Sequence, residues 1–156
     1  MFQGSYARQT REMCADQTFS FYTFDTPKMT VYINGKKNTY GHMSTYEKGK
    51  YPTDELRNHY SYCYGGDYAQ VEFQNKASQG GTLLVIANSY SNAVAPLLAN
   101  HFTRTIFVDP RYYEDWAGSP FRLDAFCEKE GVDKVLYLAD VAMFLTDEAE
   151  KGGDAE

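Results

Sequence analysis

A serine that follows an apolar segment is the residue of this sequence best placed for chemistry. The segment "TLLVIA" (82–87) is a continuous apolar run, which is typical of a strand covered on both faces, and Ser89 follows it at a turn before a helix. A serine hydroxyl in such a turn is a candidate nucleophile if a base accepts its proton. The N–H groups at a helix N-terminus would stabilise a developing oxyanion there. The simpler alternative is that Ser89 only caps the helix or forms the turn.

The base that Ser89 would need is not evident from the sequence. The chain has three histidines, His42, His59 and His101. His101 follows Ser89 on the predicted helix, and the helical rise puts it about 18 Å away. The other two lie in the first half of the chain, and a surface or packing role is the simpler interpretation for each of the three.

Two further polar segments are candidates for binding. In "VDPRYYED" (108–115), Asp109 ends a predicted strand and is followed by Arg111 and Tyr112. Two interpretations stand side by side: an Asp109–Arg111 ion pair that fixes the loop, or an Arg111–Tyr112 pair that holds a polar or anionic substrate group. In "YGGD" (64–67), Gly66 offers a backbone N–H donor, although paired glycines more often mark a turn.

The second half of the chain predicts an α/β fold that would position these residues. Strands are expected at 82–87, 105–110 and 134–140, with helices between them. A strand–helix–strand–helix–strand order gives a parallel sheet, in which ligands bind at the carboxyl ends of the strands. Ser89, Asp109 to Tyr112 and Asp140 should therefore lie along one edge.

The two helices of this half are predicted from their caps and apolar spacing. The first should begin near Asn92, because Pro96 belongs in a first turn. The second should run over 119–131, with Ser119 as N-cap, Pro120 at the first helical position and Gly131 as its stop. The residues expected to face the core are Ala93, Val94, Leu97 and Leu98 in the first helix, and Leu123, Phe126 and Cys127 in the second.

The first half of the chain reads as β-rich, with hairpins. Strands are expected at 17–24, 28–35 and 68–75, with an Asn34–Gly35 turn, a return strand near 36–42, and a short helix after an N-cap at Thr53. We expect one domain over 1–146, with a β-rich part (1–78) and a βαβαβ part (79–146). The acidic tail, 147–156, is expected to be disordered.

Composition excludes several classes of partner. A net charge of -6 argues against nucleic acid as the main partner. No apolar run is long enough to span a membrane, and the first residues do not form a secretory signal. The three cysteines lack the spacing of a metal site, and no nucleotide-binding motif occurs, so no metal or cofactor is expected. A disulfide between Cys14 and Cys63 remains possible. The high content of 14 Tyr and 10 Phe is typical of a β-rich sheet. The alternative explanation is a carbohydrate-binding surface, on which aromatic rings stack on sugars.

The segment "LLVIANSYSNAVAPLLANHFTRTIFVDPRYY" (83–113) closely resembles the C-terminal block of the bacterial DHHW proteins. This family is similar to the SGNH hydrolase superfamily and related to the alginate O-acetylation proteins. The segments "GSYARQ" (4–9) and "YSYCYGGDYAQVEF" (60–73) resemble family segments in the same order. The resemblance implies a partial SGNH-like (flavodoxin-like) three-layer α/β fold with a parallel sheet, preceded by a β-rich segment.

The resemblance also implies a function. Ser89 stands at the nucleophile position of a serine esterase or O-acetyltransferase acting on acylated cell-envelope polysaccharide, and Asn88 stands where the family has Asp. The residues expected to bind the oxyanion or the substrate are Gly66, Asn88, Tyr90, Asn92, Arg111 and Tyr112.

The family's Asp-His motif precedes the serine, and none occurs between Met1 and Ser89. We therefore expect a chain that begins inside a larger fold and is inactive by itself. Its expected partners are the missing N-terminal part or a second copy, and its expected location is extracytoplasmic. The alternative is a non-catalytic glycan-binding or assembly module with a degenerate SGNH-like fold.

Overall fold

The structure of the chain, a computed structural model, describes residues 24–41, 59–141 and 143. The chain divides into two compact units. The smaller unit comprises Met1–Asp25 and Thr39–Asp67, and the larger comprises Thr26–Asn38 and Tyr68–Glu156. The strand expected at 17–24 and the N-cap expected at Thr53 fall outside the described residues, apart from Phe24, which lies in no strand.

The described part of the smaller unit is built around helix α2 (His59–Tyr64). Cys63 and Tyr64 are buried, and Tyr40 and Tyr60 pack against them. The Tyr60 and Tyr64 ring centroids are 4.8 Å apart. Cys63 is a free thiol, so the possible bridge to Cys14 is not formed, and burial raises the pKa of this thiol.

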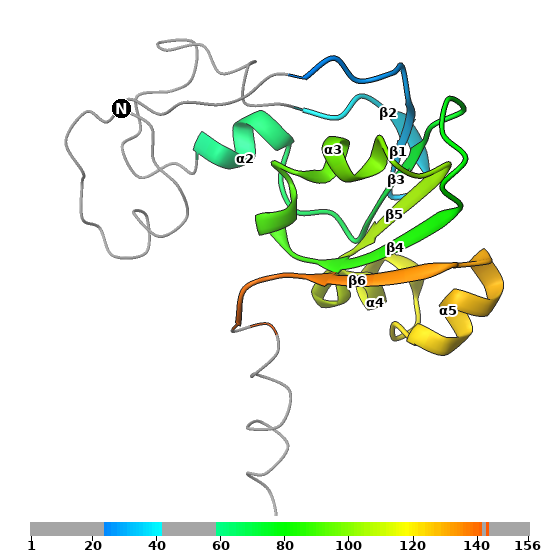
Figure 1. The fold of residues 1–156 in the computed structure, drawn as a ribbon. Coiled ribbons are helices and arrows are strands. Elements are labelled where there is room, and N and C mark those ends of the chain that lie inside the picture. Colours follow the sequence, from blue (N-terminus) through cyan, green and yellow to red (C-terminus); the bar gives the residue numbers. More distant parts are fainter. Residues whose placement is uncertain (1–23, 42–58, 142, 144–156) are drawn as a thin grey trace, which may run out of the picture. The chain divides into compact units, whose positions relative to one another are not determined.

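The larger unit contains one sheet of six strands in the order β2-β1-β3-β5-β4-β6 (Figure 1). Strands β4, β5 and β6 are parallel, and the other neighbouring pairs are antiparallel. The parallel part confirms the α/β prediction, whereas the sequence did not show that the first-half strands join the same sheet. The strands are β1 (Thr30–Ile33), β2 (Lys36–Asn38), β3 (Gln70–Gln74), β4 (Thr82–Ala87), β5 (Arg104–Val108) and β6 (Lys134–Leu138).

A tight turn joins β1 to β2, as its sequence predicted. Asn34 and Gly35 have φ values of 47° and 74°, the left-handed conformation that an Asn-Gly hairpin turn requires. The Asn34 side chain also accepts a hydrogen bond from the Gln70 N–H at 3.0 Å, and the Asn34 N–H donates to the Gln70 carbonyl at 2.8 Å. The turn is therefore tied to β3, which places the hairpin beside the parallel strands.

Helices lie on both faces of the sheet (Figure 1), and they leave β6 largely exposed. On one face lie α4 (Pro110–Ala117) and α5 (Leu123–Glu130). Their cluster has a buried Phe126, with Leu123 and Cys127 partly buried, as predicted. The strand residues of this cluster alternate along β4 and β5: Leu84, Ile86, Ile106 and Val108.

The opposite face carries α3 (Ala95–Ala99), which contacts β3 and β5. The predicted buried face of this helix was wrong, because Ala95 and Ala99 are buried whereas Val94 is exposed. Pro96 occupies the first turn, and the helix begins only at Ala95. Ala93 and Val94 therefore precede the helix and do not lie on its buried side. The residues predicted to face the core are exposed (Ala93, Val94) or half-buried (Leu97, Leu98).

The helix α4 was not predicted. Its signals are nevertheless present: Asp109 is the N-cap, Pro110 the first helical residue, and Gly118 ends the helix at φ 73°. The next helix begins later than expected, after an Arg122 N-cap that makes no side-chain capping bond, so the predicted start at Ser119 was wrong. The predicted stop at Gly131 is confirmed by its left-handed φ of 62°.

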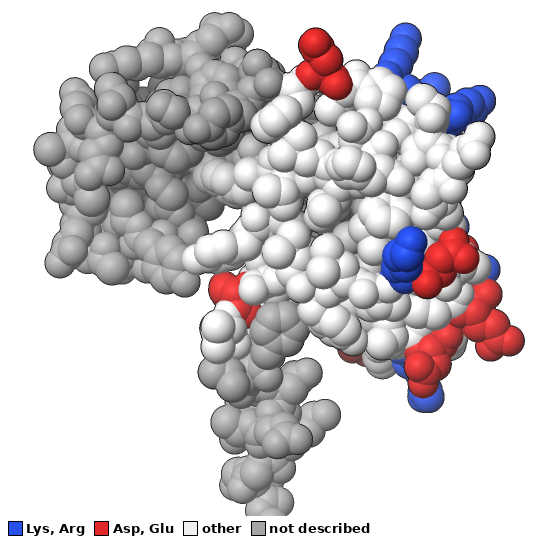
Figure 2. Space-filling view, in the orientation of Figure 1, with Lys and Arg blue, Asp and Glu red and all other residues white. Residues whose placement is uncertain are grey.

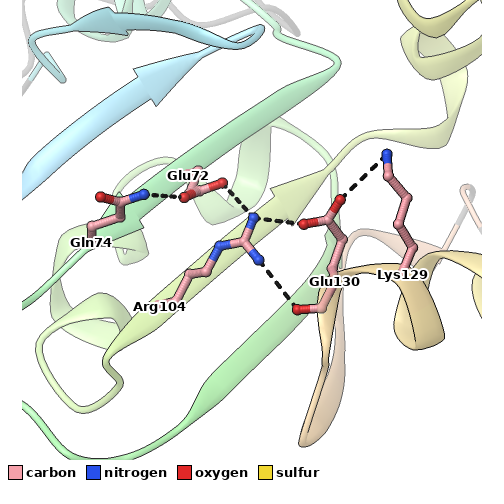
Figure 3. A network of polar contacts seen from close by, with 5 residues as sticks. All are labelled: Glu72, Gln74, Arg104, Lys129 and Glu130. Carbon is pink, nitrogen blue, oxygen red and sulfur yellow. Dashed lines mark hydrogen bonds and ion pairs between the residues drawn. The ribbon is translucent and has the colours of Figure 1, made fainter.

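A charged network ties α5 to the sheet (Figure 3). The Arg104 guanidinium on β5 lies 2.8 Å from Glu72 of β3 and 2.7 Å from Glu130 at the end of α5. Gln74 donates a further hydrogen bond to Glu72 at 2.7 Å. Burial would raise the pKa of the Glu72 carboxyl, but these hydrogen bonds and the charge of Arg104 together lower it.

Candidate functional site

The carboxyl ends of the three parallel strands meet at one edge of the sheet. Ile86 of β4 is paired with Val108 of β5, and Ala87 of β4 with Leu138 of β6. Neighbouring strands lie about 4.8 Å apart, so the residues after these pairs are close neighbours. The predicted gathering of Ser89, Asp109 to Tyr112 and Asp140 along one edge is confirmed at the level of the backbone.

The chain leaves β4 and β5 toward opposite faces of the sheet. The connection after β4 leads to α3 on one face, and the connection after β5 leads to α4 on the other (Figure 1). In open α/β sheets such a divergence leaves a crevice at the strand ends, and ligands bind there. Ser89 follows β4, the strand between the other two, and therefore stands at this point of divergence.

The turn that carries Ser89 is a short 3-10 helix, η2 (Ser89–Ser91). Asn88 is its N-cap, and its side-chain oxygen accepts a hydrogen bond from the Tyr90 N–H at 3.1 Å. The Ser91 hydroxyl donates to the Asn88 carbonyl at 2.9 Å, and both residues are buried. Ser89 between them is half-buried, so its side chain is not sealed in the core. Asparagine is a preferred N-cap residue, so this capping role of Asn88 was predictable from its type; a role in substrate binding stays a prediction.

Contrary to the prediction from the sequence, Ser89 does not lie at the N-terminus of an α-helix. The α-helix begins six residues later at Ala95 and has only five residues. The N–H groups of Tyr90, Ser91 and Asn92 all donate within the turn, to Asn88 or to the Ser89 carbonyl. These three donors therefore serve the turn, and an oxyanion role for the Ser89 N–H stays a prediction. Gly66 belongs to the smaller unit, and its oxyanion role likewise stays a prediction.

Asp109 fixes the rim of the edge beside Ser89. Its carboxylate accepts hydrogen bonds from the Arg111 N–H at 3.1 Å, from Arg111 Nε at 2.9 Å and from Arg111 Nη2 at 2.6 Å. The ion-pair interpretation of "VDPRYY" is thus confirmed. The Arg111 guanidinium lies 5.1 Å from the centre of the Tyr112 ring and remains exposed, so a substrate role for these two residues stays a prediction.

Replacement of Asp109 by alanine is expected to lower the free energy of unfolding by about 2 kcal/mol, because the buried carboxylate both caps α4 and holds Arg111. Asp109→Asn is the matched control, since an amide oxygen still caps the helix but gives up the ion pair. Asp109→Asn should lower the free energy of unfolding by about half as much as Asp109→Ala. Chemical denaturation of the three proteins measures the difference, and equal losses in both variants would contradict the capping role.

The three histidines do not supply a base at this edge within the described residues. His42 lies outside them, and His59 begins α2 in the smaller unit, where its side chain is not described. His101 follows α3, and its carbonyl lies against Gly80, just before the first residue of β4. Six strand residues separate that end of β4 from Ser89, which amounts to about 20 Å. His101 is therefore excluded as the base, as the sequence indicated.

Two kinds of feature are absent from the part of the chain that the structure describes. Within 24–41, 59–141 and 143, no three His, Cys, Asp or Glu side chains are grouped so that they could hold a metal ion. In the same part of the chain, no helix has the length and apolar character needed to cross a membrane.

The fold is similar to that of known structures. A structure of Bacillus cereus PatB1 with a sulfonyl adduct matches 75% of this chain at 21% identity and a TM-score of 0.54. A second structure of PatB1 matches 74% at 22% identity and a TM-score of 0.53. A DHHW family protein from Eubacterium siraeum DSM 15702 is also similar, with 71% coverage, 21% identity and a TM-score of 0.46.

The PatB1 match shows that the chain has an α/β fold of the PatB1 type. The chain spans about 37% of the length of that protein. No family model and no curated protein matches the sequence. At this level of identity the PatB1 match shows the fold alone.

Proposed function

We propose that Ser89 is the nucleophile of an acyl-transfer site, in an SGNH-like serine esterase or O-acetyltransferase that acts on cell-envelope polysaccharide. The observation that carries this proposal is the place of Ser89, directly after β4 where the connections to α3 and α4 diverge. The fold shared with PatB1 supports it, since one PatB1 structure holds a sulfonyl adduct. Sulfonyl reagents form such adducts with nucleophilic side chains.

In this proposal the Ser89 hydroxyl oxygen attacks the carbonyl carbon of an ester. A base takes the hydroxyl proton, the alcohol leaves with a proton, and the acyl group stays on Ser89 until water or a sugar hydroxyl accepts it. The N–H group of Ser89 binds the oxyanion. The residues that line the site beside it are Asn88, Tyr90, Asn92, Arg111 and Tyr112.

The described residues do not show the base of the site. The described residues place no imidazole beside Ser89, and the Asp109 carboxylate at this edge is occupied by Arg111. We infer that an Asp–His pair completes the site and that the chain without it is inactive or nearly so. A polysaccharide substrate would place the protein outside the cytoplasm.

Covalent labelling tests the assignment of Ser89. The chain is incubated with phenylmethylsulfonyl fluoride and imidazole, which accepts the serine proton while fluoride leaves. We expect one adduct per chain, located at Ser89 by peptide mapping, and none in Ser89→Ala. Ser119, which is exposed in the loop before α5, is the internal control and should stay unlabelled. Labelling at Ser119 to the same extent as at Ser89 would mean that Ser89 has no special reactivity.

A non-catalytic glycan-binding module is the second candidate function. Tyr112 and Trp116 are 39% and 38% exposed and lie four residues apart on α4, hence on one side of that helix. Exposed aromatic rings so spaced can stack on sugar rings. The labelling experiment separates the two functions, because a binding module gives Ser89 no reason to react ahead of other serines.

A further inference from the structure

Two buried polar residues flank Ser89 in its turn. Asn88 before it is 6% exposed, and Ser91 after it is 3% exposed. Tyr90, by contrast, is 55% exposed, and Ser89 itself is half-buried. Side chains three residues apart in a 3-10 turn lie one above the other. Asn88 and Ser91 therefore share the inward side of the turn, and the side chain of Ser89 lies on another side.

The Ser91 hydroxyl fixes the peptide unit that leads into Ser89. It donates to the Asn88 carbonyl at 2.9 Å, and the Ser91 N–H donates to the same carbonyl at 3.0 Å. That carbonyl and the Ser89 N–H belong to one trans peptide unit, so they point in opposite directions. Because the carbonyl is held toward the buried Ser91, the Ser89 N–H is directed away from the core.

The peptide unit that leads out of Ser89 is fixed as well. Its N–H, which belongs to Tyr90, donates to the Asn88 side chain at 3.1 Å. Its carbonyl, which belongs to Ser89, accepts a hydrogen bond from the Asn92 N–H at 3.2 Å. Both peptide units that adjoin Ser89 are thus held by groups of the same short segment.

Hydrogen bonds, and not ion pairs, determine the shape of this segment. The residues from Asn88 to Asn100 include no Asp, Glu, Lys or Arg. Figure 2 shows no charged side chain over the stretch where Figure 1 draws α3, the helix that follows the turn. The direction of the Ser89 N–H therefore depends on a few neutral contacts, and the Ser91 hydroxyl makes one of them.

We propose that Ser91 is a positioning residue of the acyl-transfer site, whose hydroxyl holds the Asn88–Ser89 peptide unit so that the Ser89 N–H faces the oxyanion. Ser91 is buried and does not touch the substrate, so it acts only through the peptide unit that it holds. This role rests on the function proposed for Ser89, and it adds the residue that orients the oxyanion donor.

Loss of the Ser91 hydroxyl should slow the reaction of Ser89. In Ser91→Ala the Asn88 carbonyl keeps only the bond from the backbone N–H, whose 3-10 geometry is poor, so the peptide unit can rotate. Removal of one oxyanion donor lowers a rate about 10²–10³-fold, and a misdirected donor loses part of that effect. We therefore expect Ser89 to react about tenfold more slowly in Ser91→Ala.

The rate of sulfonyl labelling at Ser89 tests this role. Each protein is incubated with phenylmethylsulfonyl fluoride and imidazole, and peptide mapping over time gives the rate constant at Ser89. Ser91→Cys keeps the volume but offers only a weak donor, so it should react as slowly as Ser91→Ala. Ser91→Thr keeps the hydroxyl and should restore most of the rate.

Thr105→Val is the matched control, because it removes another fully buried hydroxyl, on β5, and should leave the rate unchanged. Thermal unfolding establishes that each protein is folded at the labelling temperature. A lower unfolding temperature in Ser91→Ala without slower labelling would overturn the positioning role, as would a folded Ser91→Thr that reacts no faster than Ser91→Ala. If Ser89 of the unaltered chain reacts no faster than Ser119, the function proposed for Ser89 itself fails.

Discussion

Imidazole in solution is expected to accelerate ester hydrolysis by this chain, and Ser89→Ala is expected to remove that acceleration. If the Ser89 hydroxyl is nucleophilic, a small base that diffuses to the site can accept its proton. A positioned general base contributes about 10²–10⁴-fold to a rate, and a free base lacks the positioning. We therefore expect a rate on the order of tenfold above that of Ser89→Ala at the same imidazole concentration.

The measurement follows p-nitrophenyl acetate hydrolysis against imidazole concentration, with the rate of imidazole alone subtracted. Ser119→Ala removes an exposed hydroxyl elsewhere and should behave as the unaltered chain. Equal rates for the unaltered chain and Ser89→Ala would sink the nucleophile assignment. Rapid hydrolysis without imidazole, lost in Ser89→Ala, would show instead that the chain already contains a base.

Arg104→Met is expected to give the largest loss of stability, about 2–3 kcal/mol in the free energy of unfolding. The side chain of Arg104 is 27% exposed and neutralises Glu72, whose side chain is only 10% exposed, together with Glu130 (Figure 3). Without it two carboxylates remain beside each other, one of them buried. Removing one partner of a buried ion pair lowers the free energy of unfolding by about 3–5 kcal/mol. Because Arg104 is partly exposed, we expect a loss at or below the lower end of that range.

The pH dependence of this loss identifies charge as its cause. The pKa of Glu72 is lowered in the folded chain, so its contribution to stability is fully present above its unfolded pKa of about 4.3 and is lost as the pH falls through the lowered folded value. The difference between the two proteins should therefore be largest near neutral pH and shrink below about pH 4.

Lys129→Met is the matched control for Arg104→Met. Lys129 lies 3.5 Å from Glu130, but its side chain is 76% exposed, so the loss should stay within about 0.5 kcal/mol. Urea denaturation between pH 3.5 and pH 7 measures all three proteins. A loss in Arg104→Met that does not change over this range would mean that packing, and not charge, is responsible.

The sequence by itself determined the parallel part of the fold and the place of Ser89. The runs 82–87 and 134–140 are continuously apolar apart from their ends, a pattern typical of strands in a parallel sheet, and the structure has β4 and β6 within them, β4 buried and β6 largely exposed. The Asn34–Gly35 turn was predictable because few other residue pairs adopt two successive left-handed conformations. The edge that gathers Ser89, Asp109 and Asp140 followed from the geometry of parallel strands.

Only the tertiary structure decided which strands are neighbours and which helical side chains are buried. The antiparallel pairing of β3 with β5 joins segments more than 25 residues apart, and no local pattern specifies such a pairing. The buried side of α3 depends on where Pro96 sets its start, and the Glu72–Arg104–Glu130 network depends on three separate elements meeting. Local sequence fixes periodicity and turns through short-range sterics, whereas sheet order and helix rotation minimise the exposed apolar surface of the whole unit.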